Sequence, residues 1–218
     1  MSAEPSFPGA AEPLERRIRT ALAGSQAAES QDSWRPFGAH IDRLAAAFPD
    51  FSFDTLRESS VLVPILRRAD GPSVLLTRRA DTLRTHQGQM SFPGGRREPG
   101  ETPVETALRE AQEEVGLSPA VVDVIGRLHD TPTMTGFIIS PIVGVVEREP
   151  SLRVDAREVA ELVEVPLAFV LDRRNYRRES FVRGGTELWY YELLWQEQRV
   201  WGATAGILHD LCERVAAT

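Results

Sequence analysis

The sequence predicts one main layered domain of the α/β (α+β) class. The chain has 218 residues, its composition is 42% hydrophobic and 26% charged, and its apolar segments alternate between strand-like and helix-like patterns. Strands precede a central helix, and further strands and a closing helix follow it. We expect residues 1–35, rich in Ala, Ser, Glu and Pro, to be a flexible arm, and residues 36–218 to form a single domain.

The first predicted elements of the domain are a helix and two strands. Residues 38–48 carry apolar side chains at helical spacing, and Pro49 ends that helix. Residues 60–68 and 72–79 are rich in aliphatic side chains, and the Asp-Gly pair at 70–71 is typical of a turn. The sequence therefore predicts a strand pair directly after the helix.

The second half of the chain predicts more strands and a last helix. The strands, rich in β-branched residues, are expected at 121–129, 137–148 and 158–167, with a hairpin over 180–195 that turns at Gly184 and Gly185. A short helix is expected at 168–172 and a closing helix at about 204–215.

Composition and charge argue against several function classes. The formal net charge is -7 and the chain contains no lysine, so arginine supplies every permanent side-chain cation. This balance disfavours nucleic acid as a partner. No run of about 18 apolar residues is present and the first residues lack the order of a secretory signal, so we expect a cytoplasmic protein with no membrane partner. The single cysteine, Cys212, is interpreted as a buried small hydrophobe.

The central helix is predicted by signals at both of its ends. Thr102 followed three residues later by Glu105 is a capping box, and Pro103 stands at the first helical position. Gly116 is a typical residue for the helix end. The sequence therefore fixes which side chains share a face of this helix.

Glu110, Glu113 and Glu114 project from nearly one face of the predicted helix. Like charges this close destabilise a helix, and a hard divalent cation such as Mg²⁺ offsets that cost because it prefers carboxylate oxygens. A metal site is one interpretation. The alternative is a solvated acidic face neutralised by arginines.

Residues 95–117 resemble the Nudix box: Gly, five residues, Glu, seven residues, Arg-Glu, an apolar residue, one residue, Glu-Glu, one residue, Gly, apolar. The fixed positions are Gly95, Glu101, Arg109, Glu110, Glu113, Glu114 and Gly116. Ala111 departs from the larger aliphatic residue usual in the family, which affects packing and removes no ligand. The resemblance implies a Nudix hydrolase with the Nudix fold, a mixed β-sheet sandwiched between α-helices.

The resemblance also implies roles for the box residues. It implies that Mg²⁺ or Mn²⁺ is held by Glu110, Glu113, Glu114 and the Gly95 carbonyl, and that Arg109 and Glu101 pair to orient the helix. The expected catalytic residues are thus Glu113, Glu114, Arg109 and Glu101. The metals would neutralise charge on the pyrophosphate and lower the pKa of the attacking water. Candidate general bases are Glu113, Glu114, Glu158 and Glu161, with a box glutamate ranked first.

Residues 75–95 resemble a second signature, found upstream of the box in the coenzyme A pyrophosphatase branch of the family. The matching positions are Leu75, Leu76, Thr77, Arg79, Ala80, Leu83, Arg84, His86, Gly88, Phe92, Pro93, Gly94 and Gly95, and Met90 replaces the usual valine. The two signatures together cover about a fifth of the chain. They imply hydrolysis of coenzyme A, or a derivative, to 4'-phosphopantetheine and adenosine 3',5'-bisphosphate.

Substrate contacts are expected from Arg79, Arg84, His86 and Gly94. Coenzyme A carries a 3'-phosphate besides its pyrophosphate, so it needs cations other than the metals, and the two arginines are candidates. Their alternative role is an ion pair with Asp81 or a glutamate. His86 could donate to a phosphate or brace the loop. Gly94 permits close backbone approach to the phosphates.

Several assignments stay open in the sequence. Trp189, Tyr190 and Tyr191 are interpreted as core or sheet-covering residues in preference to an adenine platform. Rival substrates are ADP-ribose, NADH or another nucleoside diphosphate derivative. A Nudix ligand sensor without catalysis is disfavoured because every box carboxylate is present. Residues 138–146 and the last helix are candidate surfaces for a homodimer.

Overall fold

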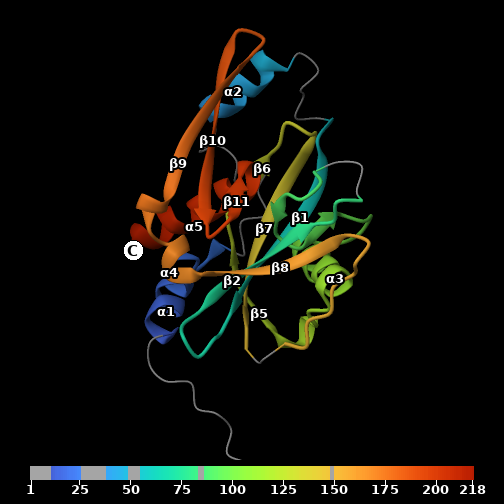
Figure 1. Cartoon of the computed structure of the whole chain (residues 1–218), viewed down its shortest axis with the longest axis vertical. Helices are drawn as coiled ribbons and strands as arrows, with labels where there is room; N and C mark the ends of the chain where they lie inside the picture. The colour runs from blue at the N-terminus through green and yellow to red at the C-terminus, as the bar shows by residue number, and fades with distance from the viewer. Residues whose placement is uncertain (1–10, 26–37, 49–54, 83–85, 148–149) are drawn as a thin grey trace, which may run out of the picture.

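The computed structural model describes residues 11–25, 38–48, 55–82, 86–147 and 150–218. They form an eight-stranded mixed sheet, a three-stranded sheet and the helices that cover them (Figure 1). Within these residues no helix is both long and apolar enough to cross a membrane.

The main sheet is centred on a parallel pair of strands, β1 (Arg57–Leu66) and β7 (Phe137–Val146). All its other pairings are antiparallel: β1 pairs with β2 (Ser73–Arg79) and β4 (Gly94–Arg96), β2 pairs with β3 (Met90–Ser91) and β8 (Val159–Pro166), and β7 pairs with β5 (Val122–Arg127) and β6 (Thr131–Pro132).

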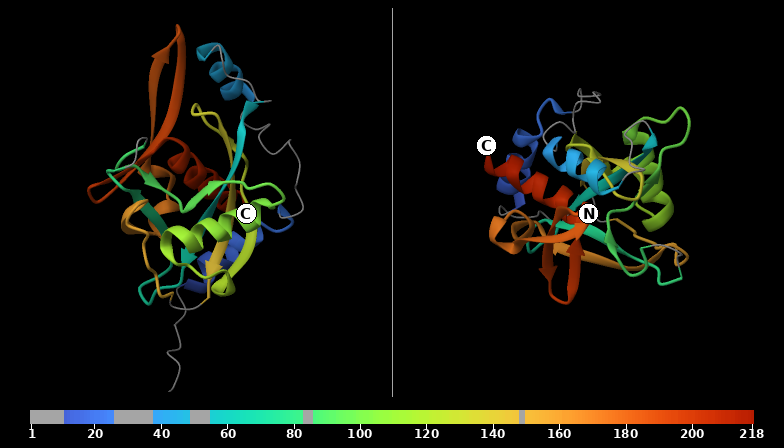
Figure 2. Two further views of the ribbon diagram at one scale, coloured as in Figure 1. Left: turned by 90° about the vertical axis from the view of Figure 1, so that its right-hand side faces the viewer. Right: turned by 90° about the horizontal axis from the view of Figure 1, so that it is seen from above.

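Helices cover both faces of this sheet because side chains alternate along each strand. In β1, Leu62 and Leu66 belong to the core cluster under α3 (Pro103–Val115). Val63 and Ile65 point the other way, into the cluster that includes α1 (Ala11–Ala21) and α5 (Gly202–Ala216). Figures 1 and 2 show α3 on one side of the sheet and α1 and α5 on the other. The predicted mixed sheet sandwiched between helices is confirmed.

Part of the segment expected to be a flexible arm belongs to this core. Ile18 and Leu22 of the α1 region are completely buried, and Leu14 packs beside them. These residues are four apart, so they form one apolar stripe on the helix. Residues 11–25 therefore contribute to the core, while the division into an arm at 1–35 and a domain at 36–218 stays a prediction.

A second, three-stranded sheet carries the predicted hairpin, and its upper part projects beyond the main sheet (Figure 1). It consists of β9 (Tyr176–Arg183), β10 (Thr186–Trp195) and β11 (Gln198–Trp201), and the hairpin turns at Gly184 and Gly185 as predicted. Helix α2 (Gly38–Ala47) packs Leu44 and Ala47 against Leu188 of β10. The short α4 (Leu167–Val170) and the 3-10 turns η4 (Pro119–Val121) and η5 (Arg173–Asn175) complete the described elements.

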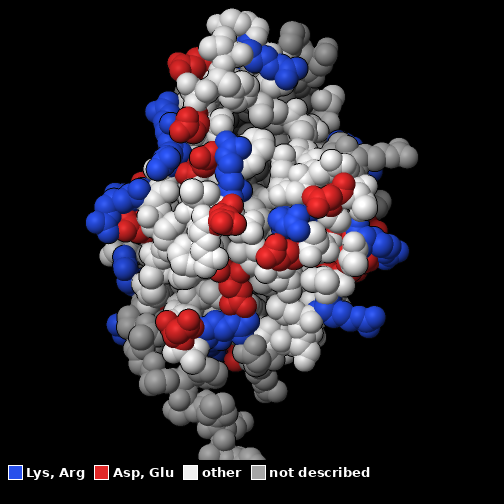
Figure 3. Space-filling view, viewed as in Figure 1, with Lys and Arg blue, Asp and Glu red and all other residues white. Residues whose placement is uncertain are grey.

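The aromatic and thiol side chains of the last elements are structural. Tyr191 stacks on His209 of α5 with ring centroids 3.8 Å apart, and it packs against the main core, which supports the core interpretation. Cys212 is 1% exposed, as predicted. On the outer surface, arginines and acidic side chains lie interspersed over the face in Figure 3.

Candidate active site

Helix α3 begins and ends at the residues that the sequence predicts. The Thr102 hydroxyl oxygen accepts a hydrogen bond from the Glu105 amide at 3.3 Å, and the Glu105 carboxylate accepts one from the Thr102 amide at 2.7 Å. Gly116 ends the helix with a φ of 71°, the left-handed conformation that glycine adopts without strain. The capping box is confirmed, and it fixes the directions of the glutamates.

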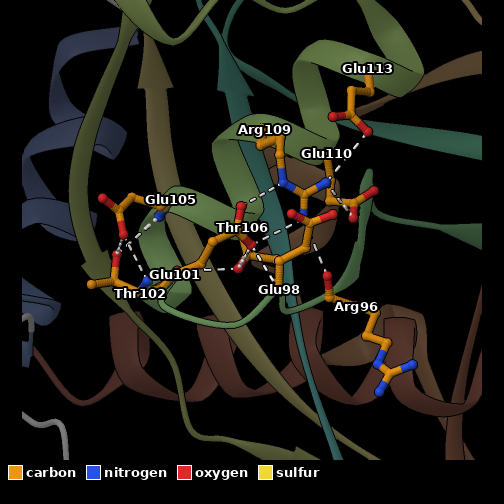
Figure 4. A network of polar contacts seen from close by, with 9 residues as sticks. All are labelled: Arg96, Glu98, Glu101, Thr102, Glu105, Thr106, Arg109, Glu110 and Glu113. Carbon is orange, nitrogen blue, oxygen red and sulfur yellow. Dashed lines mark hydrogen bonds and ion pairs between the residues drawn. The ribbon is translucent and has the colours of Figure 1, made fainter.

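Arg109 is the centre of a polar network on α3 (Figure 4). Its Nε donates to Glu101 Oε1 at 2.6 Å, its Nη2 donates to Glu101 Oε2 at 3.1 Å, and Nη2 also donates to the Arg96 carbonyl at 3.2 Å. This two-pronged contact, with further hydrogen bonds from the Glu98 amide and the Thr106 hydroxyl, lowers the pKa of Glu101 to about 2. The network ties α3 to the loop that follows β4.

Glu114 is a buried carboxyl group with no arginine bonded to it in the described part of the chain. It is 5% exposed, and its Oε2 accepts a hydrogen bond from the Gly94 amide at 3.3 Å. Burial, followed by repulsion from Glu158, raises its pKa to about 8. Glu110 is half-buried beside it, and burial is the largest cause that raises its pKa. Two partly desolvated acids thus share one region of the helix.

The backbone of Gly95 lies close to the Glu110 carboxylate. A Cβ atom built on Gly95 would lie 2.5 Å from Glu110 Oε1, so any side chain there would displace the end of the Glu110 side chain. Gly95 pairs with Ser60 of β1, so β4 lies beside the first half of that strand. The Gly95 backbone and the Glu110 carboxylate therefore form a narrow cradle lined by oxygen atoms.

The three box glutamates point in different directions around this cradle. Arg109 Nη1 contacts Glu110 at 2.9 Å and Glu113 at 3.4 Å, while Glu114 turns to Gly94. Across the described residues, no three acidic, histidine or cysteine side chains are gathered closely enough to hold a metal ion as they stand. The donor set still fits a hard cation, because it consists of carboxylate and carbonyl oxygens around desolvated acids.

Arg79 lies at the end of β2, close enough to Glu114 to lower its pKa electrostatically. Its Nε is buried and has no hydrogen-bond partner in the described structure. Asp81, the partner in the alternative interpretation of Arg79, contacts Arg78 at 3.5 Å. Arg79 is thus a half-buried cation with an unused donor near Glu114.

The other residues of the upstream signature are only partly described. Arg84 lies outside the described residues. His86 is exposed, has a φ of 59°, and its Nδ1 lies 2.8 Å from Gln89 Oε1, a contact that braces the loop. Gly94 cannot bear a side chain, because a Cβ there would lie 2.5 Å from the Ser60 carbonyl oxygen.

Two glutamates outside the box occupy different environments. Glu158 raises the pKa of both Glu110 and Glu114, so it belongs to the same acidic cluster. Its backbone carbonyl accepts the Ala80 amide at 2.8 Å, which fixes it beside the end of β2. Glu161 lies 3.2 Å from Arg78 and is not among the main causes of either pKa shift. Of these two candidates for the general base, Glu158 is thus the one with the clear electrostatic link to the box glutamates.

The fold and this helix define the class of protein. A family model described as the NUDIX domain matches residues 56–182, more than half of the chain, and the chain therefore belongs to the Nudix family. It is a Nudix hydrolase, a class that acts on small-molecule nucleoside diphosphate derivatives and generally uses divalent metals such as Mg²⁺ or Mn²⁺.

Two bacterial relatives match over most of their length. The chain is 39% identical over 182 residues to a protein from Cronobacter sakazakii described as an uncharacterized Nudix hydrolase NudL, covering 80% of this chain and 94% of the relative. A relative of the same description from Yersinia enterocolitica is 40% identical over 158 residues, covering 72% and 80%. A solved Nudix hydrolase from M. smegmatis, RenU, has a TM-score of 0.46 and 24% identity over 52% of this chain and 73% of that one.

Proposed function

We propose that this Nudix hydrolase cleaves the pyrophosphate bond of coenzyme A or a derivative, with 4'-phosphopantetheine and adenosine 3',5'-bisphosphate as products. The observation that carries the proposal is the upstream signature, which continues without a break into the box. Among the described residues of this segment, Arg79, Gly94 and Gly95 lie beside Glu110 or Glu114.

The residues that would hold Mg²⁺ or Mn²⁺ are Glu110, Glu113, Glu114 and the Gly95 carbonyl. When bound, the cation supplies charge neutralisation at the pyrophosphate and makes water more acidic. Arg109 Nη1 contacts one oxygen of Glu110 and one oxygen of Glu113, so the other oxygen of each carboxylate could contact the cation, while Glu101 holds Nε and Nη2 of Arg109. Arg109 and Glu101 are therefore positioning residues for α3.

Arg79 supports binding of the substrate pyrophosphate, because its positive charge lies near Glu114 and its Nε has no partner among the described residues. The Gly94 and Gly95 backbone lets phosphate oxygens approach closely. His86 takes the bracing role in the loop through Gln89. A box glutamate remains our first choice for the general base, and Glu158 is the second because it shares the acidic cluster.

The test compares kcat/KM for coenzyme A, ADP-ribose, NADH and diadenosine tetraphosphate, each with Mg²⁺ and with Mn²⁺. We expect coenzyme A to be turned over fastest, with the two products above released in equal amounts. Faster turnover of another substrate would overturn the coenzyme A assignment and leave the Nudix chemistry in place. The homodimer, the cytoplasmic location and the exclusion of nucleic acid and membranes stay predictions from the sequence.

A further inference from the structure

Arg96 follows the cradle glycine in β4 but lies on the opposite face of the strand. Gly95 faces Glu110 of α3. Because successive residues of a strand point to opposite faces, the side chain of Arg96 leaves on the other side, next to Ser59 in the register with β1. Figure 4 shows its guanidinium directed away from the network around Arg109.

The Arg96 guanidinium is exposed and has no partner among the described residues, while its backbone is held firmly. Its carbonyl accepts the hydrogen bond from Arg109 Nη2 at 3.2 Å. The neighbouring Arg97 differs, since it lies 3.3 Å from Glu58. Arg96 is thus an uncompensated cation fixed one residue from the cradle of Gly95.

The outer edge of β4 has no neighbouring strand among the described residues. In the described part of the chain, β4 pairs with β1 and with no other strand, so its second edge carries no neighbouring strand. Gly94 and Gly95 add no side chains at this edge. Gly95 and Arg96 are consecutive residues of β4, so the places that they mark lie on the two faces of one strand.

A second arginine adds positive charge to this face. Arg57 lies two residues before Ser59 in β1, so it is a diagonal neighbour of Arg96, at about 7–8 Å between such positions. It is exposed, with its guanidinium 4.0 Å from the centroid of the Phe137 ring, and no carboxylate pairs with it in the described structure. The two arginines suit a doubly charged phosphate group better than a neutral one.

We propose that Arg96, supported by Arg57, binds the 3'-phosphate of the substrate ribose and so sets specificity for coenzyme A over its 3'-dephosphorylated form. This inference rests on the proposed function. It assigns the two phosphate groups to opposite faces of β4, with the pyrophosphate beside Arg79 and Glu114 and the phosphate monoester beside Arg96.

The experiment measures kcat/KM of the wild type, Arg96→Gln and Arg97→Gln for coenzyme A and for 3'-dephospho-coenzyme A. Loss of one charge-assisted contact should lower the Arg96→Gln value for coenzyme A by about 10- to 100-fold and leave the value for the dephospho form unchanged. Arg97→Gln is the matched control, since this arginine is paired with Glu58, and we expect neither substrate to be affected.

Each outcome of this experiment is decisive. Equal losses on both substrates in Arg96→Gln, or no loss on either, would overturn the inference and leave the proposed function intact. Equal kcat/KM of the wild type for coenzyme A and its dephospho form would also overturn the inference and leave the proposed function intact. A wild type that hydrolyses neither substrate would overturn the proposed function as well. Calorimetric binding gives a second readout: Arg96→Gln should weaken binding of adenosine 3',5'-bisphosphate and not of adenosine 5'-monophosphate.

Discussion

Glu114 is the carboxylate that its surroundings perturb most among those at the candidate site. It is 5% exposed, and burial raises its pKa to about 8. We expect Glu114→Gln to lower kcat by at least about 100-fold with Mg²⁺, since the amide keeps the shape and the contact with the Gly94 amide but loses the charge that a cation requires. The measurement is steady-state hydrolysis of coenzyme A.

The control for this substitution is Glu179→Gln, which removes an exposed carboxylate from β9, away from α3. It should keep the wild-type rate. Circular dichroism should show the same folded structure for both variants. If Glu114→Gln retained full activity, the chemistry would have to be assigned to other carboxylates, with Glu158 the first to examine.

Gly95→Ala tests the cradle without removing any carboxylate. The backbone at Gly95 does not have a positive φ, so alanine is acceptable there except that its Cβ would meet Glu110 at 2.5 Å. We expect kcat/KM to fall by about 10- to 100-fold, as when the surroundings of a metal ligand are disturbed, and the metal concentration for half activity to rise.

The matched substitution is Gly206→Ala in α5, where a Cβ would have no atom within 4 Å. There the activity should be unchanged and the free energy of unfolding should increase by about 0.5–1 kcal/mol, because alanine favours a helix interior. Equal activity in the two alanine variants would contradict the role of the Gly95 cradle.

Helix α3 depends on its cap for its start and on the core for its position. Thr102→Ala removes the side-chain acceptor of the Glu105 amide and the hydroxyl that donates to the Glu105 carboxylate at 2.8 Å. We expect a loss of about 1 kcal/mol in the free energy of unfolding, measured by urea denaturation. Activity should persist, because Ala107, Ala111 and Val115 still anchor the helix.

Thr82→Ala serves as the comparison for the cap. Thr82 is exposed, and its side chain has no hydrogen bond to any described residue. Its free energy of unfolding should match the wild type. If the Thr102 and Thr82 variants were equally stable, the capping contact would contribute nothing.

The sequence predicted those elements whose signals are local. Thr102, Glu105 and Gly116 set the ends of α3 through contacts within a few residues, and Gly184 and Gly185 set the hairpin turn in the same way. The packing of α1 could not be predicted, because Ile18 and Leu22 are buried by β-strands and by α5, far away in the chain. Polar residues around that stripe made the segment resemble a flexible arm.

The candidate site likewise combines features set by local sequence with features set by contacts between distant parts of the chain. The resemblance to the Nudix box predicted the Arg109 contact with Glu101, and helical spacing predicted the shared location of Glu110 and Glu114. It could not separate Glu158 from Glu161, because their positions depend on how β8 pairs with β2. The sequence also could not predict on which face of β4 the Arg96 side chain lies, because that depends on the register of β4 with β1.

Ion pairs that join α1 to the main sheet give the whole chain an acid-sensitive stability. Glu15 of α1 accepts hydrogen bonds from Arg67 at the end of β1, at 2.9 Å to each of its oxygens, and Arg19 of α1 reaches Asp123 of β5 at 2.6 Å. The hydrogen bonds from Arg67 are the largest cause that lowers the pKa of Glu15. A carboxylate whose pKa is lower in the folded state stabilises the fold only while it is ionised.

This linkage predicts a pH dependence with a definite sign. Above the ordinary glutamate pKa the stabilisation by Glu15 is fully present, and it is lost as the pH falls through the lowered folded-state pKa. Glu15→Gln should therefore be less stable than the wild type at neutral pH, and the difference should vanish in acid once Glu15 is protonated in both states. Urea unfolding at a series of pH values measures the stability of the wild type and of Glu15→Gln.

The control is Glu197→Gln, at an exposed glutamate without an ion pair in the described structure. Its stability should follow that of the wild type at every pH. A Glu15→Gln difference that stayed constant with pH would show that the side chain contributes by packing and not by its charge.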